Sequence, residues 1–524
     1  MLKRTFIPLL LLLISFGITH AQDRTISVDV NKVKGNLNTF FSECVGAGRA
    51  NEGLRADWQR QLRMAKEQLG FRYIRMHGIL HDDMGVYFED GQGKPIYNWQ
   101  YIDELYDFLI SIKVRPFVEF GFMPKALASK PTTLSFWFWK PNVSPPKDYQ
   151  KWDDLIAALV RHWTERYGEA EVKQWYFEVW NEPNLKNIFW AGDQDEYFKL
   201  YKETANAVKS VSPAYRVGGP ATAGNAWIPE FINYCTTNKV PVDFVSTHCY
   251  GNDIFIQKTD DEVTATTKRK NAVSGDVTKS RMQISQSSMP SLPLHYTEWN
   301  SSSSFNDHIH DHYRQASYIL EKVKRIGNAA NSFSYWTFTD IFEEEGPRQT
   351  PFHGGFGLIN YQDIKKPAFY AYRYLNLLGK QELQNADTSS WVCRDNKGGV
   401  QVLLYDFTDK LFPALSDSKA FYSSVIPPKG KGKVSLVYKN LAPGKYTMTV
   451  YKTGYGANDP YTSYLQLGAP SQLTKPQVAL IKQKDNDVPI MSKAVVVTGK
   501  KPVEESFDLL ENDVILVTLK KVGA

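Results

Sequence analysis

Two glutamates close apolar runs at separate places in the chain. Glu182 follows the run Gln174–Trp180 and is followed at once by Pro183, and Glu298 comes at the end of Leu294–Trp299. Two carboxyl groups about 5 Å apart can hydrolyse a glycosidic bond with retention: one is protonated and assists the leaving oxygen, and the other is ionised and attacks the anomeric carbon. The pair therefore predicts this chemistry, provided that the fold brings the two segments together.

The neighbours of Glu182 and the other carboxylates bear on this prediction. Asn181 offers an amide to a sugar 2-hydroxyl, a contact that can strengthen in the transition state. Glu178 lies inside the same apolar run, so we expect a structural or supporting role for it. Glu119, which closes the run Phe117–Glu119, is a rival carboxylate. Because a single glutamate at a strand end is more often solvated or ion-paired, the prediction rests on the whole set.

The elements that must position these residues alternate between strand and helix patterns from about residue 38 to residue 379. Helical segments such as Trp152–Trp163 carry apolar residues at helical spacing, with charges between them. Eight apolar runs have the character of strands: Phe40–Ala47, Tyr73–Leu80, Arg115–Phe122, Gln174–Trp180, Arg216–Pro220, Asp243–Tyr250, Leu294–Trp299 and Ser332–Phe338. Eight such units predict an α/β fold, a (β/α)8 TIM barrel with its catalytic groups at the C-terminal ends of the strands. No GxGxxG turn follows the first run, which argues against a dinucleotide-binding sheet.

The chain after residue 379 has a different pattern. Tyr446, Met448 and Val450 alternate with more polar residues, and turn signals separate such runs. This pattern predicts an accessory antiparallel β-sandwich over residues 380–524. A strand within residues 22–37 alternates in the same way and is expected to join it, with the catalytic barrel spanning residues 38–379.

Residues 1–21 have the composition of a secretory signal peptide. Lys3 and Arg4 precede an apolar run from Phe6 to Ile18, and small-residue cleavage chemistry ends at Ala21. The apolar run is shorter than the roughly 20 residues that a membrane span needs. We therefore expect a secreted protein, periplasmic or extracellular, with no membrane span.

The remaining bulk properties exclude some partners. The chain has 62 basic and 56 acidic residues, a formal charge of +6, and loss of the signal peptide removes two of the basic residues. Such a small charge argues against a nucleic-acid partner. The 14% share of aromatic residues suits a protein that binds sugars. Four widely spaced cysteines show no metal-ligand spacing, and their pairing is left open: Cys44, Cys235, Cys249 and Cys393.

Several segments together resemble a known family. The sequence is similar to the clan of retaining TIM-barrel glycosidases and, more narrowly, looks like glycoside hydrolase family 39, which includes β-xylosidases and α-L-iduronidases. The segments that carry the resemblance are Met76–Asp83, Phe177–Asn184, Thr247–Tyr250, Thr297–Trp299, Tyr335–Glu345 and Phe352–Gly357. The resemblance implies that Glu182 is the acid/base and Glu298 the nucleophile. It also implies contacts to the sugar from His77, Asn181, His248, Tyr250, Trp336, Glu344 and Glu345.

These implied roles agree with the chemistry of the residues. Trp336 can stack on a pyranose face, while imidazoles and carboxylates can hold hydroxyl groups. Glu182, between Trp180 and Pro183, is expected to have a raised pKa through partial desolvation, whereas Glu298 is expected to stay ionised. A structural histidine is the alternative for His77 and for the histidine of strand six. No cofactor or metal is expected.

The resemblance also bears on the sugar. The iduronidase branch carries a lysine two residues beyond the strand-six histidine, where this chain has Tyr250, and three consecutive acids, Glu343–Glu345, would repel a uronic acid. Arg348 could compensate for them. We expect a neutral glycoside, β-xyloside first, with arabinosides, galactosides and iduronides as alternatives. Exo action is expected because the insertion of residues 251–274 would tend to close one end of a groove; the oligomeric state is left open.

Two other functions stay in view. A barrel that has become a sugar-binding protein would keep the aromatic and histidine contacts but lose a catalytic acid, and both acids are present. Metal-dependent hydrolysis would need clustered ligands, and His308, His310 and His312 do cluster. We expect them at a solvated helix N-terminus instead.

Overall fold

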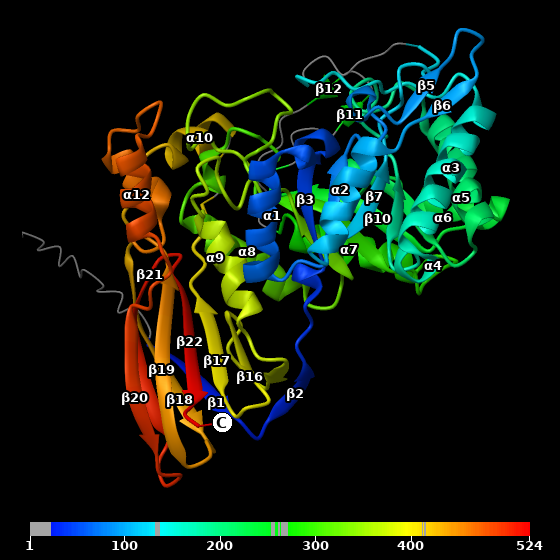
Figure 1. Cartoon of the computed structure of the whole chain (residues 1–524). Helices are drawn as coiled ribbons and strands as arrows, with labels where there is room; N and C mark the ends of the chain where they lie inside the picture. Colours follow the sequence, from blue (N-terminus) through cyan, green and yellow to red (C-terminus); the bar gives the residue numbers. More distant parts are fainter. Residues whose placement is uncertain are drawn as a thin grey trace, which may run out of the picture.

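The computed structural model describes residues 23–130, 137–252, 257–259, 262–263, 271–410, 412 and 415–523 (Figure 1). The expected signal peptide of residues 1–21 lies outside this part of the chain, as does most of the insertion of residues 251–274. None of the helices in the described ranges is long and apolar enough to cross a membrane.

The catalytic part is a closed barrel of eight parallel strands in chain order, which confirms the predicted fold class. The strands are β3 (Cys44–Arg49), β4 (Tyr73–His77), β7 (Arg115–Phe120), β8 (Tyr176–Val179), β9 (Arg216–Thr222), β10 (Phe244–Tyr250), β13 (Leu294–Asn300) and β14 (Ser332–Tyr335). The ring closes where Tyr335 pairs with Val45. Each predicted strand is present with shifted ends; the first begins later than predicted because Phe40–Ser42 forms the 3-10 turn η1.

Helices surround this barrel. They are α1 (Ala56–Leu69), α2 (Gln100–Ser111), α3 (Tyr149–Tyr167), α4 (Glu169–Val172), α5 (Gln194–Val211), α6 (Ile228–Asn238), α7 (Ser274–Ser285), α8 (Arg314–Ile326) and α9 (Pro367–Asn376). Helix α3 shows why such segments form: the Asp148 side chain accepts two backbone N–H groups at its start, Leu155, Leu159 and Trp163 are buried along one face, and Gly168 ends it. The connections include the short turns η2 (Ala50–Leu54), η3 (Asp82–Met84), η4 (Ala223–Asn225) and η5 (His308–His310) and the strand pairs β5 (Tyr87–Glu89) with β6 (Pro95–Tyr97) and β11 (Gln257–Thr259) with β12 (Glu262–Val263).

Two sheets pack below the barrel in Figure 1 as a β-sandwich. The larger sheet has the order β2-β15-β16-β17-β22-β19-β20, and the smaller has the order β1-β18-β21. Their strands are β1 (Arg24–Asp29), β2 (Val33–Asn36), β15 (Gln381–Leu383), β16 (Ser390–Arg394), β17 (Val400–Tyr405), β18 (Gly430–Lys439), β19 (Gly444–Thr453), β20 (Met491–Val497), β21 (Val503–Leu510) and β22 (Val514–Lys521). The two N-terminal strands lie in separate sheets, β1 parallel to β18 and β2 antiparallel to β15. Ile26, Leu436 and Val517 belong to the core between the sheets.

Three helices interrupt the sandwich strands, which the sequence pattern did not indicate: α10 (Leu415–Tyr422), α11 (Pro460–Gln466) and α12 (Lys475–Lys484). Tyr422 of α10 packs with Ile309, in the loop after β13. Tyr461 of α11 packs with Phe352, in the loop after β14, and stacks on His308 with 5.2 Å between the ring centroids. The sandwich side of the molecule therefore supports two loops at the C-terminal end of the barrel.

A buried lysine joins the same two loops. Lys366 Nζ lies 2.7 Å from Asp311 Oδ1 and 2.6 Å from Asp340 Oδ2, and all three side chains are fully buried. Lys366 also donates to the Gly355 carbonyl, at 2.9 Å. Burial alone would lower the pKa of Lys366, but the two carboxylates raise it. The ammonium thus holds the loop after β13 to the loop after β14.

Replacing this lysine should destabilise the protein strongly. Lys366→Met leaves two buried carboxylates without their cation, which costs about 3–5 kcal/mol. We expect a clearly lower midpoint of thermal unfolding than in Lys475→Met, a control at an exposed position on α12. Equal midpoints for the two variants would show that the buried ion pairs do not hold these loops.

Candidate active site

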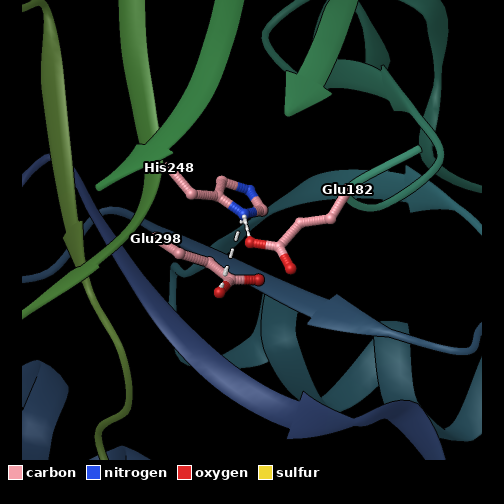
Figure 2. Close-up of side chains that lie close together, drawn as sticks. All are labelled: Glu182, His248 and Glu298. Carbon is pink, nitrogen blue, oxygen red and sulfur yellow. Dashed lines mark hydrogen bonds and ion pairs between the residues drawn. The ribbon is translucent and has the colours of Figure 1, made fainter. Parts of the chain in front are cut away.

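The two predicted glutamates meet at the C-terminal mouth of the barrel. Glu182 follows β8 and Glu298 lies in β13, and Figure 2 shows His248 of β10 next to both. One carboxylate oxygen of each glutamate and one ring nitrogen of His248 all lie within 4.8 Å of one another. Retaining hydrolysis needs carboxyl groups about 5 Å apart, whereas inversion needs about 6.5–9.5 Å to admit a water. The geometry therefore fits retention.

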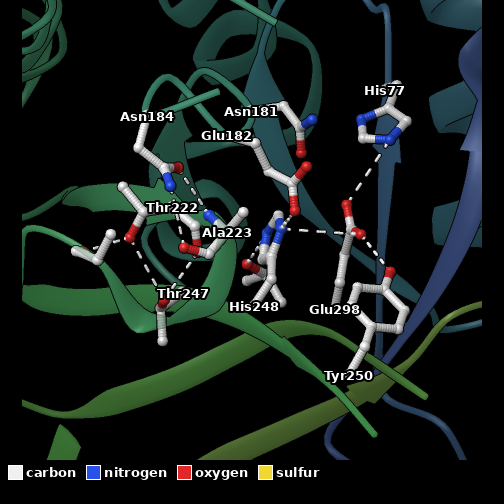
Figure 3. A network of polar contacts seen from close by, with 12 residues as sticks. His77, Asn181, Glu182, Asn184, Thr222, Ala223, Thr247, His248, Tyr250 and Glu298 are labelled. Atoms are coloured by element: carbon white, nitrogen blue, oxygen red, sulfur yellow. Dashed lines mark hydrogen bonds and ion pairs between the residues drawn. The ribbon is translucent and has the colours of Figure 1, made fainter. Parts of the chain in front are cut away.

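The backbone at Glu182 is strained and firmly held. Trp180 and Glu182 have φ angles of 70° and 45°, a region that residues other than glycine seldom adopt. The Glu182 N–H donates to the Ala221 carbonyl at 2.8 Å, and Asn184 exchanges two hydrogen bonds with the backbone of Ala223 (Figure 3). These bonds to the end of β9 hold the turn that aims Glu182 at Glu298.

A buried arginine, Arg75 of β4, forms ion pairs with Glu298, the candidate nucleophile, and with two other buried glutamates. Its Nη1 lies 2.5 Å from Glu298 Oε1, its Nε 2.9 Å from Glu178 Oε2, and its Nη2 2.8 Å from Glu119 Oε2. Nη2 also donates to Asn181 Oδ1 at 2.9 Å, which fixes the orientation of that amide. Glu178 thus has the supporting role that we expected.

Arg75 was not among the site residues predicted from the sequence, although a signal for it was present. Arg75 is two residues from His77 in β4, so both side chains lie on the same side of the strand, toward the barrel interior. An inward-facing cation in an apolar run requires buried carboxylates. That requirement could have linked strand two to the acids of the other strands.

Opposing influences act on the ionisation of Glu298. Burial raises the pKa of Glu298, while Arg75, His77 and the Tyr250 hydroxyl, 2.6 Å from Oε2, act in the opposite direction. Burial in the barrel, which the sequence position did not reveal, is the cause of the rise. Burial likewise raises the pKa of Glu119 to about 8, against the opposing effect of the Arg75 charge.

His77 and Trp336 form one wall of the site. His77 Nδ1 lies 2.7 Å from Glu119 Oε2, and Nε2 lies 3.7 Å from carboxylate oxygens of Glu298 and Glu344. Burial lowers the pKa of His77 to about 3, so its ring is neutral. The Trp336 ring packs against it, with 4.8 Å between centroids. A Cβ atom at Gly46 would lie 2.5 Å from the Trp336 ring, so this glycine makes room for the indole.

His248 contacts the acid rather than presenting a vacant nitrogen to a sugar. Its Nδ1 lies 2.9 Å from Glu182 Oε1, and its Nε2 lies 3.1 Å from Thr297 Oγ1. The side chain is fully buried. The role implied by the resemblance was a sugar contact; the structure shows both ring nitrogens in hydrogen bonds with the protein.

The three consecutive acids after β14 have different environments. Glu343 pairs with Arg49 and Arg55, and Glu345 pairs with Arg348 at 2.7 Å on the exposed rim. Glu344 alone is buried near the pair, and burial, with the neighbouring carboxylates Glu298, Glu52 and Glu182, raises its pKa well above the usual value. The structure therefore brings Glu344 to the site and leaves Glu345 at its edge.

The three histidines after β13 form no metal-binding group in the described part of the chain. His310 and His312 are buried, which corrects the expectation of a solvated helix N-terminus, and α8 begins only at Arg314. His310 Nδ1 lies 2.8 Å from the Gly354 carbonyl, so this ring braces the loop after β14. Among the described residues, the group that could hold a cation consists of Glu182, His248 and Glu298. The spacing of its two carboxylates is also the spacing that a general acid/base and a nucleophile require. All four cysteines are buried, and none of them forms a disulfide bond in the described part of the chain.

Known proteins resemble the chain over about two thirds of its length or more. A "Beta-xylosidase" of Caldicellulosiruptor saccharolyticus is 38% identical over 94% of this chain and 98% of its own. A "Beta-xylosidase" of Geobacillus stearothermophilus is 46% identical over 69% of this chain and 73% of its own. The crystal structure of the GH39 enzyme from Xanthomonas axonopodis pv. citri superposes with a TM-score of 0.90, at 41% identity, over 96% of this chain and 98% of that one. Residues 24–501 match the family "Glycosyl hydrolases family 39". The chain is therefore a glycoside hydrolase that belongs to family 39.

Proposed function

We propose that this protein is an exported retaining exo-β-xylosidase, with Glu182 as acid/base and Glu298 as nucleophile. The observation that carries the proposal is the approach of the two carboxylates, whose facing oxygens lie within 4.8 Å. Asn181, His77, Tyr250, Trp336 and Glu344 complete the sugar site in this proposal. His248 acts on Glu182, and Glu345 contributes at the rim.

The reaction proceeds by two displacements. In the first, Glu298 attacks the anomeric carbon while Glu182 gives its proton to the departing glycosidic oxygen, and an ester joins the sugar to Glu298. In the second, Glu182 takes a proton from a water whose oxygen attacks the same carbon, and the bond to Glu298 breaks. The Arg75 guanidinium compensates the negative charge of Glu298 before attack and after release.

The charges around the site support a neutral sugar. A uronic acid needs a cation, and two candidate arginines already pair with acids: Arg75 with buried carboxylates, and Arg348 through Nη1 with Glu345. Tyr250, at the position where the iduronidase branch carries lysine, donates to Glu298 at 2.6 Å. The two relatives quoted above are both named β-xylosidases, which supports xylose over the other neutral sugars.

A comparison of nitrophenyl glycosides tests the sugar. We expect kcat/KM for the β-xyloside to exceed that for arabinoside, galactoside, glucoside and iduronide by about ten-fold or more, the range that pocket contacts to one sugar substituent provide. A preference for iduronide would overturn the neutral site, and binding without turnover of any glycoside would favour the sugar-binding alternative.

Export and exo action have their own tests. The N-terminal 21 residues support export, which N-terminal sequencing of the protein recovered outside the cytoplasm would test. For exo action, xylotetraose should first release xylose and xylotriose. Early accumulation of xylobiose without xylose would indicate internal cleavage.

A further inference from the structure

A line of hydrogen bonds connects the acid/base glutamate to a second carboxylate inside the barrel. Glu182 Oε1 lies 2.9 Å from His248 Nδ1, and His248 Nε2 lies 3.1 Å from Thr297 Oγ1. Thr297 Oγ1 in turn donates to Glu178 Oε1 at 2.8 Å. Apart from Glu182, these side chains are fully buried. Strands β8, β10 and β13 each contribute to the line.

The direction of these hydrogen bonds follows from the ionisation of Glu178, at the end of the line opposite Glu182. The Arg75 Nε donates to Glu178 Oε2 at 2.9 Å, and an ionised carboxylate only accepts hydrogen bonds. Burial raises the pKa of Glu178, but Arg75 and the Thr297 hydroxyl favour its ionised form. Thr297 has a single hydroxyl hydrogen, and it is directed to Glu178. The Thr297 oxygen can therefore only accept from His248, so Nε2 carries a hydrogen.

This hydrogen leaves the other nitrogen of His248 bare. Burial lowers the pKa of His248 well below its usual value, and the Arg75 charge adds to the effect, so the imidazole is neutral and has one N–H. With that hydrogen on Nε2, Nδ1 presents a lone pair to Glu182 Oε1. Two acceptors at 2.9 Å repel each other unless a proton lies between them.

We infer that Thr297 and Glu178 are positioning residues that fix His248 in its Nε2–H tautomer and thereby keep the catalytic proton on Glu182. The inference rests on the proposed role of Glu182 as acid/base. In the first displacement the Glu182 proton passes to the leaving oxygen, and in the second Glu182 takes one from water. His248 and Thr297 neither gain nor lose a proton overall. The opposite tautomer would donate from Nδ1 to an ionised Glu182 and so deplete the acid.

Other ionisable groups also face this line of hydrogen bonds and contribute to the electrostatic environment of Glu182. Glu298 Oε2 lies 3.7 Å from His248 Nδ1. The charged or titratable groups that act on His248 or Glu182 from the surrounding strands and loops include Arg75, His77, Tyr250, Glu298 and Glu344. All of them stay in place in the variants below, so a shift in those variants reports on the line itself.

Thr297→Val tests the inference through its pH profile. Valine cannot accept from Nε2, so the Nδ1–H tautomer becomes available and donates to Glu182. The basic limb of kcat/KM for xylobiose should move down by about one pH unit, with about a ten-fold loss above the limb. Thr297→Ser keeps a hydroxyl and should retain the wild-type limb. Activity on 2,4-dinitrophenyl β-xyloside, which leaves without acid assistance, should stay within about two-fold.

Glu178→Gln should also favour the Nδ1–H tautomer of His248, through a different change in the hydrogen bonds. Its carbonyl oxygen keeps the bond to Arg75, and its amide donates to Thr297, which reverses the line and directs the hydroxyl to Nε2. The basic limb should again move down. An unmoved limb in both variants, or an equal shift in Thr297→Ser, would overturn the inference.

Two further measurements separate the possible failures. If Glu182→Ala loses equal activity on xylobiose and on the dinitrophenyl glycoside, Glu182 is not the acid and the proposed function fails. If Glu182→Ala behaves as an acid variant while Thr297→Val leaves the limb in place, only the positioning role fails. Should either valine or glutamine variant not fold, ¹⁵N-histidine NMR of the unaltered protein still decides, because a hydrogen on His248 Nδ1 instead of Nε2 contradicts the inference.

Discussion

Glu298→Ala should lower kcat/KM on nitrophenyl β-xyloside by about 10⁵-fold, the scale seen when a catalytic nucleophile is removed. The reason is that a Glu298 carboxylate oxygen lies within 4.8 Å of one of Glu182, whereas Glu119 and Glu178 are bound to Arg75 deeper in the barrel. Added azide should occupy the space of the lost carboxylate and restore part of the activity. It should yield the α-xylosyl azide, because it attacks from the nucleophile side.

Glu182→Ala provides the contrast. Its loss should be about 10²–10⁴-fold on poor leaving groups and small on activated ones, since only the proton transfer is removed. Here azide should give the β-xylosyl azide, by attack on the glycosyl-enzyme. Glu230→Ala, at an exposed position on α6, is the matched control and should leave the kinetics unchanged. The same azide anomer from both variants would refute the assignment of the two roles.

Arg75→Met should be the second most damaging change. It leaves Glu298 and Glu178 buried without their cation, which costs about 3–5 kcal/mol of stability. The positive charge of Arg75 favours ionised Glu298, so its removal raises the pKa of that carboxyl further. More of the nucleophile is then protonated at any given pH, and the acidic limb of kcat/KM should move upward by about 1–3 pH units.

If Arg75→Met does not fold, the effect of Arg75 on the acidic limb of kcat/KM can be measured in Arg75→Lys. An ammonium retains the charge but cannot reach Glu119, Glu178 and Glu298 together as the planar guanidinium does. We expect an upward shift of the acidic limb smaller than that of Arg75→Met, together with a lower midpoint of thermal unfolding. An acidic limb equal to that of the unaltered protein in both variants would show that Arg75 does not control Glu298.

Periodicity was sufficient to predict the barrel, because each of its strands is a buried run followed by a helix and such runs are visible in one sequence. The ends were less accurate: Phe40–Ser42 forms a 3-10 turn, since a bond from the Ser42 N–H to the Thr39 carbonyl precedes the strand. Helices α10–α12 were missed because they are short insertions held mainly by contacts with barrel loops rather than by a long amphipathic pattern of their own.

The site was predictable where residue type alone suggests a role. Glu182 and Glu298 follow from strand ends, and their approach is in the structure. Arg75 and Thr297 act through residues on other strands, and such relations depend on side chains that face one another across the barrel. For the same reason, the sequence around each residue could not predict the hydrogen bonds of His248 with Glu182 and Thr297 or the burial of Glu298. These are properties of the assembled interior.

The contacts of α10 and α11 with the loops after β13 and β14 bear on how the protein can be engineered. A barrel cut at residue 379 would lose Tyr422 and Tyr461, and with them the packing that steadies Ile309 and Phe352. It would also lose the partners of strands β1 and β2. The barrel is therefore not expected to be stable without the β-sandwich. Truncations and fusion proteins should include the β-sandwich and helices α10–α12.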